Sequence, residues 1–488
     1  MVEQSMCGTT ADTGRTEFKA HEEKATGLAQ LLRSKDIPDM RIVSGEGEKA
    51  IYSRDQSDVP GFLKDLLLDH DPDLVVQPRT IEAVVKAIAV ATELNIPIIA
   101  RGAASSPFGG AVPVRKGMVI DMSQMDRIIE VDHKDRRIKV QAGARWADVD
   151  HELSKSGLRL RTSPSSKFST VGGWVAGGGI GIGSLGHGHL SKNVLSIQLA
   201  TVNGVRSICP SEKLFSSVFG SEGQLGIITE VTLAVNPIDP SSRPHLVIME
   251  DLSKALQLAH RLRYLSDRPE DLIYFSPGKM RYLDRLLGQQ HFPKGHALLV
   301  TSGNEASENA IHALLSELGA REEQEYLARL MWHERYFPMK LRRLGPGMLG
   351  AEVFAPNERL EQVLYKAEAL CREFALDPLL EVHFIQGLES LLLCYYLTDQ
   401  SNEATYALDA VKSMIVTAAL VGMGSRPYSL GIWNNSFVDR MPEAEVSGLR
   451  LAKDRYDPDG LMNQGKYFQL SGRLAGIPSR LLTPAVAG

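Results

Sequence analysis

The sequence predicts a protein of mixed helices and strands with more than one domain, and three observations support this prediction. The chain has 488 residues, more than one hydrophobic core usually holds, so two or three domains are expected. Segments with apolar residues at helical spacing are mixed with short segments in which apolar residues alternate as they do in strands. Glycine-rich stretches lie between these segments, where a backbone without side chains can approach a bound anion closely.

The first elements form a strand–helix–strand unit. Leu74-Val-Val-Gln-Pro78 predicts a buried strand, and Thr80 predicts the N-terminal cap of a helix that runs to about residue 94. Residues 96–100 predict a second strand, which leads directly into the small-residue loop 101–110. Such a unit can present the backbone amides of its loop to a phosphate group.

Further elements lie on both sides of a long glycine-rich stretch, residues 170–188. Strands are predicted at 118–121, 128–131 and 137–141, and a helix at 145–156 that ends at Gly157. After the stretch, residues 195–201 alternate as a strand, and Asn203-Gly204 predicts a hairpin turn. A short helix near 214–219 and a strand at 227–235 complete this part of the chain.

Composition and charge argue against several classes of function. The net charge of −5 and the isoelectric point near 6.3 offer no basic face to nucleic acid. No uncharged apolar run reaches the roughly 18 residues that a membrane span needs, and residues 1–25 show no secretory signal. We expect a cytoplasmic protein without a metal or iron–sulfur centre, because its cysteines are scattered without a C-x-x-C pair: Cys7, Cys209, Cys371 and Cys394.

The pattern G-x-G-x-x-G occurs at Gly181, Gly183 and Gly186, but its context is not that of a Rossmann dinucleotide site. That fingerprint needs a strand before it, a helix after it and an acidic residue about 20 positions later. Glycines precede the pattern here, no amphipathic helix is predicted after it, and residues 200–206 contain no acid. We therefore reject a Rossmann site, and the chain has no P-loop pattern either.

Five motifs resemble those of the vanillyl-alcohol oxidase / p-cresol methylhydroxylase (PCMH) superfamily of flavoproteins. In chain order they are Pro78-Arg-Thr-Ile-Glu82, the loop 101–110, Thr170-Val-Gly-Gly173, Gly223-Gln-Leu-Gly-Ile-Ile-Thr229 and Asp457-Pro-Asp-Gly-Leu-Met-Asn-Gln-Gly-Lys466. The resemblance implies a PCMH-type FAD-binding domain of two α+β subdomains, followed by an α+β substrate domain with an antiparallel sheet. The implied parts are an N-terminal arm (1–45), with one short helical pattern at 28–33, the FAD-binding domain (46–238), the substrate or cap domain (239–445) and a C-terminal segment (446–488) that returns to the FAD domain.

The resemblance also implies which residues hold FAD. They are Pro78, Arg101, Gly102, Ala103, Ala104, Ser105, Ser106, Gly109, Gly110, Pro164, Ser169, Thr170, Gly172, Gly173, Ala176, Gly179, Gly186, His187, Gly188, Glu222, Gly223, Gly226, Ile227, Ile228, Asn463 and Lys466.

Some positions depart from the family pattern. Ala103 and Ala104 stand where the family usually has glycine, and Gln464 replaces a proline. Ser105 stands where one branch has a flavin-linking histidine, so non-covalent FAD is expected. A covalent link through another histidine, such as His187, remains an alternative. We interpret His187 and His189 as hydrogen-bonding residues beside the flavin loop, the alternative being a shared metal ion.

The second half of the chain resembles the D-lactate dehydrogenase / glycolate oxidase D-subunit branch. Trp332-His-Glu-Arg335 resembles its W-x-x-R element, and Glu352-Val-Phe-Ala-Pro356 resembles the strand before a helix that ends near residue 374. The motifs H-x-G-D-G-N-x-H and G-E-H-G of that branch correspond here to Val382-His-Phe-Ile-Gln-Gly387 and Arg426-Pro-Tyr-Ser-Leu-Gly431. Only His383 is retained.

Candidate substrate-site residues come from these segments, each with a structural alternative. Arg335 can bind a carboxylate with two hydrogen bonds, or it is a structural arginine. His383 is the candidate base, because imidazole titrates in the physiological range, or it is a core histidine. The segment 424–435 mixes aromatic and amide side chains and predicts a substrate pocket, with core packing as the alternative; its candidates are Arg426, Tyr428, Trp433 and Asn434.

Three hypotheses for the function follow. The first is an FAD-dependent dehydrogenase of D-2-hydroxy acids such as lactate or glycolate. Its electrons would pass to a partner protein, an electron-transfer flavoprotein or an iron–sulfur subunit, because the chain shows no second redox centre. The second is an alcohol or phenol oxidase of the vanillyl-alcohol oxidase type, which Gly109-Gly-Ala-Val-Pro113 also resembles. The third is a flavin-bearing electron-relay subunit of a larger complex.

Overall fold

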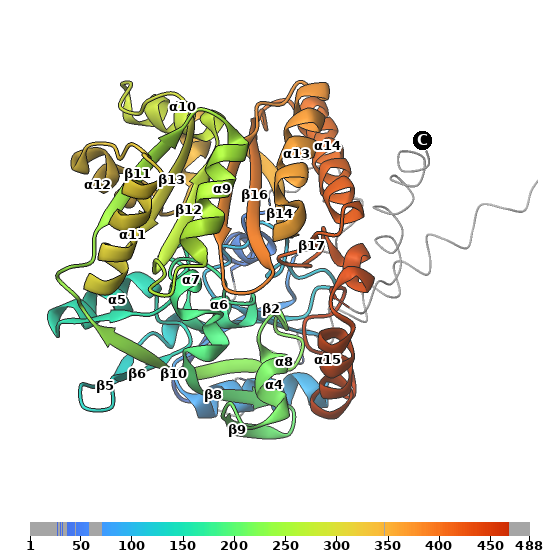
Figure 1. The fold of residues 1–488 in the computed structure, drawn as a ribbon. Helices are drawn as coiled ribbons and strands as arrows, with labels where there is room; N and C mark the ends of the chain where they lie inside the picture. The colour runs from blue at the N-terminus through green and yellow to red at the C-terminus, as the bar shows by residue number, and fades with distance from the viewer. Residues whose placement is uncertain are drawn as a thin grey trace, which may run out of the picture.

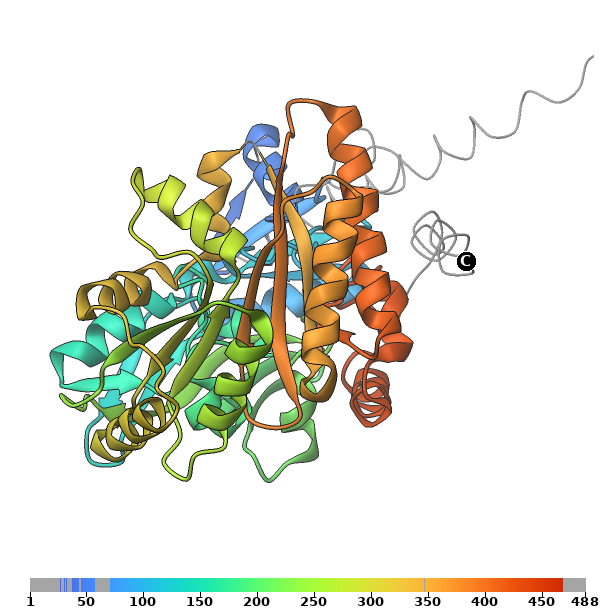
Figure 2. The same ribbon diagram turned by 45° about the horizontal axis from the view of Figure 1, so that its top comes forward.

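The computed structural model describes residues 37–43, 45–57, 71–345 and 347–467, together with Gly27, Gln30 and Leu32. Two sheets of a first domain lie below a larger sheet of a second domain in the view of Figure 1. Figure 2 shows the same layers from a direction turned by 45°. The helix expected at 28–33 lies almost wholly outside the described residues.

The first sheet has four strands in the order β1–β2–β4–β3. Strand β4 pairs in parallel with β2 on one side and with β3 on the other. Helix α4 follows β2, and its N-terminus is capped by the Thr80 side chain, which accepts a hydrogen bond from the Ala83 amide. The predicted strand–helix–strand unit is therefore confirmed. β1, which falls in the expected surface arm, extends this sheet instead, because Val43 packs in a small core with Val75. The bounds are β1 (Met40–Val43), α2 (Glu46–Lys49), η1 (Ala50–Ser53), β2 (Leu74–Pro78), α4 (Ile81–Glu93), β3 (Ile98–Arg101), β4 (Met118–Asp121) and η2 (Met122–Gln124).

The second sheet is antiparallel, with the order β5–β6–β10–β8–β9 and β7 paired to one end of β10. Its long strands lie within two residues of the predicted ranges, because alternating burial gave each a clear signal. The bounds are β5 (Ile128–Asp132), β6 (Arg137–Gln141), α5 (Trp146–Lys155), β7 (Leu158–Leu160), β8 (Val194–Thr201), β9 (Gly204–Ile208), α8 (Lys213–Val218) and β10 (Ile227–Pro237).

The glycine-rich stretch contains short helices that the sequence did not predict. They are α6 (Val171–Ala176) and α7 (Ser184–His187), followed by η3 (Leu190–Lys192). Thr170 caps α6 by accepting a hydrogen bond from the Gly173 amide at 3.3 Å. Gly172 lets this helix approach the chain after β6, since a Cβ there would lie 2.7 Å from the Cβ of Ala142. The rejection of a Rossmann site still holds, because the neighbouring sheet is antiparallel.

The second domain is built on a seven-stranded sheet with the order β11–β13–β12–β15–β16–β14–β17. Every pairing in it is antiparallel, as expected. The bounds are β11 (Pro244–Met249), β12 (Asp271–Phe275), β13 (His296–Thr301), β14 (Gly347–Pro356), β15 (Leu379–Phe384), β16 (Glu389–Thr398) and β17 (Arg426–Pro427).

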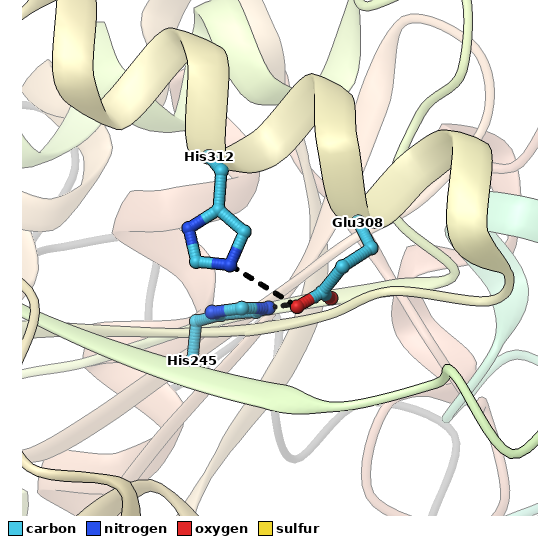
Figure 3. Close-up of side chains that lie close together, drawn as sticks. All are labelled: His245, Glu308 and His312. Atoms are coloured by element: carbon cyan, nitrogen blue, oxygen red, sulfur yellow. Dashed lines mark hydrogen bonds and ion pairs between the residues drawn. The ribbon is translucent and has the colours of Figure 1, made fainter.

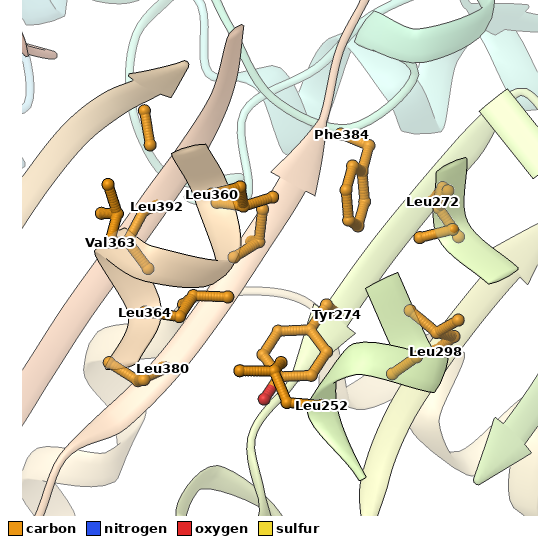
Figure 4. Packing of buried hydrophobic residues seen from close by; sticks show 14 of the residues in the cluster. Leu252, Leu272, Tyr274, Leu298, Leu360, Val363, Leu364, Leu380, Phe384 and Leu392 are labelled. Carbon is orange, nitrogen blue, oxygen red and sulfur yellow. The ribbon is translucent and has the colours of Figure 1, made fainter. Parts of the chain in front are cut away.

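Helices cover the outer face of this sheet, and the first domain lies against its inner face. Leu252, Leu364 and Leu420 from three outer helices pack on sheet residues such as Tyr274 and Leu380 in one cluster, part of which Figure 4 shows. The outer helices are α9 (Leu252–Arg263), α11 (Glu305–Glu317), α13 (Leu360–Glu373) and α14 (Glu403–Gly422). The inner face packs on α10 (Pro277–Leu287), α12 (Glu325–Glu334) and η4 (Pro338–Leu344), with η5 (Asn357–Arg359) and η6 (Asn435–Arg440) in connecting segments.

One outer helix, α14, has the length and apolar composition that a membrane span requires. In the structure 44% of an apolar 18-residue stretch of this helix is buried, and Val416 and Leu420 pack in the core of the second domain. A buried core helix passes the same compositional test.

The chain finally returns to the first domain. Helix α15 (Glu443–Tyr456) lies beside α8, and Met462 then forms a parallel bridge with Ile98 of β3. The Ile98 amide donates to the Leu461 carbonyl at 2.9 Å, and the Asn463 amide donates to the Ile98 carbonyl at 2.7 Å. The segment after α15 therefore lies at the edge of the first sheet, next to the loop that follows β3.

Candidate active site between the two domains

One cavity lies between the glycine loops of the first domain and the inner face of the second domain. Its first wall consists of residues within 100–111, 164–181 and 218–228. Its second wall consists of Phe337, Pro338, Met339, Glu352, His383, Leu391, Leu393, Tyr395, Tyr428 and Ser429. An elongated ligand with its polar end at the loops would therefore place its other end against the seven-stranded sheet.

Most of the predicted FAD-binding residues line this cavity. Loops far apart in the sequence come together here because β3, α6 and β10 all end or begin at the same edge of the first domain. The lining residues among them are Arg101, Gly102, Ala103, Ala104, Ser105, Ser106, Gly110, Pro164, Ser169, Thr170, Gly172, Gly173, Ala176, Glu222, Gly223, Gly226, Ile227 and Ile228.

The loop after β3 fits a diphosphate. No backbone N–H of residues 102–106 donates a hydrogen bond to the described part of the chain, although all five residues line the cavity. Ala104 has a left-handed φ of 50°, a turn conformation that helps successive N–H groups to converge on an anion. Gly110 faces open space, since nothing lies within 4 Å of a Cβ built there. The residues present therefore fit the phosphate end of FAD.

Two predicted residues support this loop from behind without lining the cavity. Lys466 is fully buried, and its ammonium group donates to the Gly110 carbonyl and to Asn463 Oδ1, each at 2.7 Å. Asn463 in turn donates to the carbonyl oxygens of Gly110 and Glu222. Burial lowers the pKa of Lys466 to about 7, while Asp55 and Glu222 oppose that change. These two side chains fasten the loop 101–110 to the segment around Glu222.

Other predicted FAD residues have packing positions instead. A Cβ at Gly186 would lie 2.9 Å from Glu270 Cα, and a Cβ at Gly188 would lie 2.8 Å from the side chain of Lys192. His187 forms a hydrogen bond with Glu270 at 3.1 Å and does not line the cavity, so the geometry gives no support to a covalent flavin link there. Gly109, Gly179 and Pro78 are likewise absent from the cavity wall, because they pack on Ile432, Leu190 and β1, respectively.

Glu352 and Tyr395 are the polar groups at the substrate end that the sequence did not single out. Glu352 of β14 is 8% exposed, lines the cavity and accepts a hydrogen bond from the Tyr395 hydroxyl of β16. Burial raises the pKa of Glu352 to about 7, although the bond from Tyr395 and the charge of His383 lower it. A carboxyl group with this pKa can accept and release a proton at neutral pH. Its only sequence signal was an acidic residue at the head of an otherwise apolar strand.

The predicted His383 also lines the cavity, but its ring nitrogens are enclosed. Nε2 lies 2.8 Å from Glu381 Oε1, and Glu381 forms an ion pair with Lys279 at 2.9 Å. Nδ1 is buried without a hydrogen-bond partner among the described residues. Burial lowers the pKa of His383, but the hydrogen bond to Glu381 and its charge raise the pKa by more, so the pKa lies above its usual value. For the Glu381 carboxyl group burial acts in the opposite direction and raises the pKa. The charges of Lys279 and His383 outweigh burial and lower that pKa to about 2.

The remaining predicted substrate residues are divided among different places. Tyr428 lines the cavity and packs edge-to-face on Phe354. Arg335 does not line it: its guanidinium donates to the Trp332 carbonyl and the Tyr336 hydroxyl, because the chain turns back at the end of α12. Arg426 pairs with Glu389 at 2.8 Å and does not line this cavity. Trp433 and Asn434 line a neighbouring cavity that shares Phe108, Met339 and Tyr395 with this one.

The fold and the cavity together define an FAD-linked oxidoreductase. Residues 72–209 match the model of an FAD-binding domain, and residues 249–467 match the C-terminal domain of FAD-linked oxidases. The chain belongs to the PCMH-type family of FAD-linked oxidases, and its cofactor is FAD.

Individual relatives and solved structures of this family are similar to the chain over most or about half of its length. The glycolate oxidase subunit GlcD of Escherichia coli is 25% identical over 416 residues, 81% of this chain and 83% of the relative. D-lactate dehydrogenase of Anaerostipes hadrus is 26% identical over 272 residues, 54% of this chain and 56% of the relative. The structure of p-cresol methylhydroxylase with bound substrate has a TM-score of 0.76 at 15% identity, covering 94% of this chain and 98% of that one. Alkyldihydroxyacetonephosphate synthase has the same fold, with a TM-score of 0.72 at 18% identity over 90% and 85% of the two chains.

Proposed function

We propose that this protein is an FAD-dependent dehydrogenase that oxidises the hydroxyl-bearing carbon of an uncharged alcohol, including a phenol that carries such an alcohol group. The observation that carries the proposal is Glu352, a carboxyl group with a pKa of about 7 on the apolar wall opposite the cofactor loops. Bound FAD supplies the hydride acceptor. The protein positions the substrate, excludes water from it and removes one proton.

Glu352 is the proposed base for the hydroxyl proton. Above a pH of about 7 its carboxylate can accept a hydrogen bond from the substrate while Tyr395 holds the other oxygen in place. His383 then acts as a positioning residue, because its Nε2 is occupied by Glu381 and its Nδ1 is enclosed. This assignment replaces His383, the base expected from the sequence, as the leading candidate.

The charge of the cavity wall favours an uncharged substrate. Among the described residues of the second domain that line the cavity, none is arginine or lysine. A substrate carboxylate would lie beside Glu352 without a guanidinium to offset the repulsion, because Arg335 and Arg426 are bonded elsewhere. Leu391, Leu393 and Met339 provide apolar surface for the body of an organic alcohol.

A D-2-hydroxy acid is the second candidate substrate. GlcD and D-lactate dehydrogenase are relatives at 25% and 26% identity, and their names refer to glycolate and lactate. The raised pKa of His383 also allows an imidazolium that could pair with a carboxylate after a small side-chain movement. The two candidates differ in the charge that the cavity must accept, so one experiment separates them.

The experiment measures bleaching of the flavin absorption under anaerobic conditions with matched donors. We expect reduction by benzyl alcohol or 4-hydroxybenzyl alcohol and little by D-lactate or glycolate. The reverse pattern would establish the second candidate, and no reduction by any donor would remove both. Glu352→Gln should retain FAD but reduce the rate by about 10²–10⁴-fold. Glu358→Gln is the matched control, because that side chain is 78% exposed on the surface after β14.

We also propose that the electrons leave FAD to a partner protein. Cys371 and Cys394 are buried free thiols and Cys209 is an exposed one, so the described cysteines do not form the four-cysteine ligand set of an iron–sulfur cluster. GlcD, by its name, is one subunit of a larger oxidase. We expect reduced enzyme to react slowly with oxygen and rapidly with an artificial acceptor dye. Rapid reoxidation in air would instead indicate an oxidase.

A further inference from the structure

A second cluster of chemically active side chains lies on the outer side of the second domain. His245 projects from β11, and Glu308 and His312 project toward it from α11, where they are four residues apart on one helix face (Figure 3). None of the three lines the cavity of the proposed active site. The mechanism proposed above has no use for them.

The three side chains converge on one point. His245 Nε2 lies 2.9 Å from one oxygen of Glu308, and His312 Nε2 lies 3.2 Å from the other. The potential ligand atoms all lie within 4.8 Å of one another. Zinc bonds of about 2.0–2.2 Å in a tetrahedron require ligand atoms about 3.3 Å apart, so only small side-chain rotations separate this arrangement from a coordination sphere.

A fourth side chain, Glu322, bonds to one of the imidazoles and lies near the other. Glu322 accepts a hydrogen bond from His245 Nδ1 at 2.7 Å, and its other oxygen lies 3.9 Å from His312 Nδ1. A carboxylate on the outer nitrogen of a ligating histidine is the usual outer-shell arrangement at metal sites, because it fixes the ring and its tautomer. The Nε2 atom of each ring lies against one oxygen of Glu308.

Burial and access also fit a bound ion. The His245 side chain is 3% exposed between two carboxylates, whereas that of His312 is 56% exposed. A cation at the shared point would contact two imidazole nitrogens and one carboxylate, and solvent can reach it past the exposed His312 side chain. Two imidazoles and one carboxylate suit a borderline ion such as zinc, and they leave one position for water.

We propose that His245, Glu308 and His312 bind one divalent transition-metal ion of the zinc class, with Glu322 as their outer-shell partner. The ion joins the edge strand β11 to α11, and the backbone of Glu323, next to Glu322, bonds to Leu246 of the same strand. It therefore stabilises the second domain just after the chain leaves the first one. This site is independent of the oxidation chemistry.

The test uses the FAD-loaded protein, stripped with a chelator that is then removed. Titration with Zn²⁺ and with Co²⁺ should give one bound ion per chain, a visible Co²⁺ spectrum of a four-coordinate site and a higher Tm. His312→Gln should weaken binding at least tenfold and abolish the Tm increase. His151→Gln, an exposed helix histidine of the first domain, should bind like wild type.

Two outcomes would overturn the proposal. One is the absence of stoichiometric binding to wild type, and the other is equal binding by His312→Gln. Since His312 is exposed, its variant should fold, and retained FAD absorption checks this directly. Glu308→Gln provides a second variant, which should also lose the Co²⁺ spectrum while keeping the flavin.

Discussion

Opposing effects act on the pKa of Glu352, and kinetics can measure their balance because this side chain lines the cavity. Burial raises its pKa to about 7, while the Tyr395 hydroxyl and the charge of His383 keep it from rising further. If its carboxylate is the base, kcat/KM should fall about tenfold per pH unit below about 7 and level off above it. Steady-state kinetics across pH 5–9 would test this.

The Glu352→Gln variant gives the control for that profile. It should have lower activity throughout and no inflection near neutral pH. An inflection that persists in the variant would assign the titration to another group, and His383 would be the first to examine.

Ala104 is a single residue in a conformation that suits glycine. Its φ of 50° costs an alanine about 1–2 kcal/mol, part of which the extra freedom of glycine in the unfolded chain would offset. Ala104→Gly should therefore stabilise the FAD-loaded protein by up to about 1 kcal/mol. FAD fluorescence on heating should show release at a higher temperature.

Ala103→Gly is the matched control, because Ala103 is not among the residues with positive φ. It should leave the release temperature unchanged or lower it. If both variants behave alike, the strain at Ala104 is not what limits the loop.

At the scale of elements, the β14–β16 pair positions Glu352 against Tyr395. Gly350, two residues before Glu352, pairs with Tyr395 of β16. The Ser413 hydroxyl of α14 donates a hydrogen bond to the Gly350 carbonyl. A Cβ at Gly350 would collide with the Cys394 carbonyl and would lie 2.6 Å from the Tyr395 ring. Gly350→Ala should destabilise the protein by about 1–3 kcal/mol and move the neutral-pH inflection, because the Tyr395 hydroxyl is displaced.

Gly422→Ala at the end of α14 serves as the comparison, since nothing lies within 4 Å of its added methyl group. It should stabilise the helix by up to about 1 kcal/mol without changing the pH profile. Denaturant unfolding of both variants would measure the difference. Equal stability of the two would show that β16 can move aside.

Local sequence signals predicted elements well where burial alternates or a cap is present. Helix α4 with its Thr80 cap and the strands of the second sheet are examples. The short helix α6 was missed because four of its six residues are glycine or valine, which have weak helix propensities. The partnership of Glu352 with Tyr395 depends on pairing across 43 residues, which no local pattern encodes.

The same limit applied to the substrate site as a whole. The motif ending in Arg335 predicted a carboxylate-binding guanidinium, but the end of α12 directs this group onto the Trp332 ring, 3.0 Å from the ring centroid, and away from the cavity wall. Most of the motifs expected to hold the cofactor through backbone groups do line the cavity, and there the glycine itself is the signal.

At the scale of the whole molecule, Glu270 joins the two domains. Its carboxylate bonds to Arg159 and His187 of the first domain, and its carbonyl accepts from the Gly186 amide at 2.8 Å. Burial raises the pKa of Glu270, but His187 and Arg159 lower it by more, so the pKa in the folded protein lies below its usual value. Its contribution to stability is therefore complete above a pH of about 4.5 and is lost as the pH falls through the folded pKa.

Glu270→Gln should accordingly destabilise the protein by about 2 kcal/mol at pH 7. The difference from wild type should stay constant down to a pH of about 4.5 and shrink below that pH. Calorimetry at several pH values would measure it, with Glu358→Gln as the exposed control. A difference that does not shrink at low pH would mean that the ionised form of Glu270 is not what joins the domains.

The contact of Lys466 with the Gly110 carbonyl has a consequence for biosynthesis. The two residues are 356 positions apart, so the ribosome completes the phosphate loop and the entire second domain before it makes the side chain that fastens the loop. Until then the loop lacks its buried ammonium group and the Asn463 amide. We therefore expect cofactor loading to be a late event, and nascent chains that stall before residue 463 should emerge without flavin.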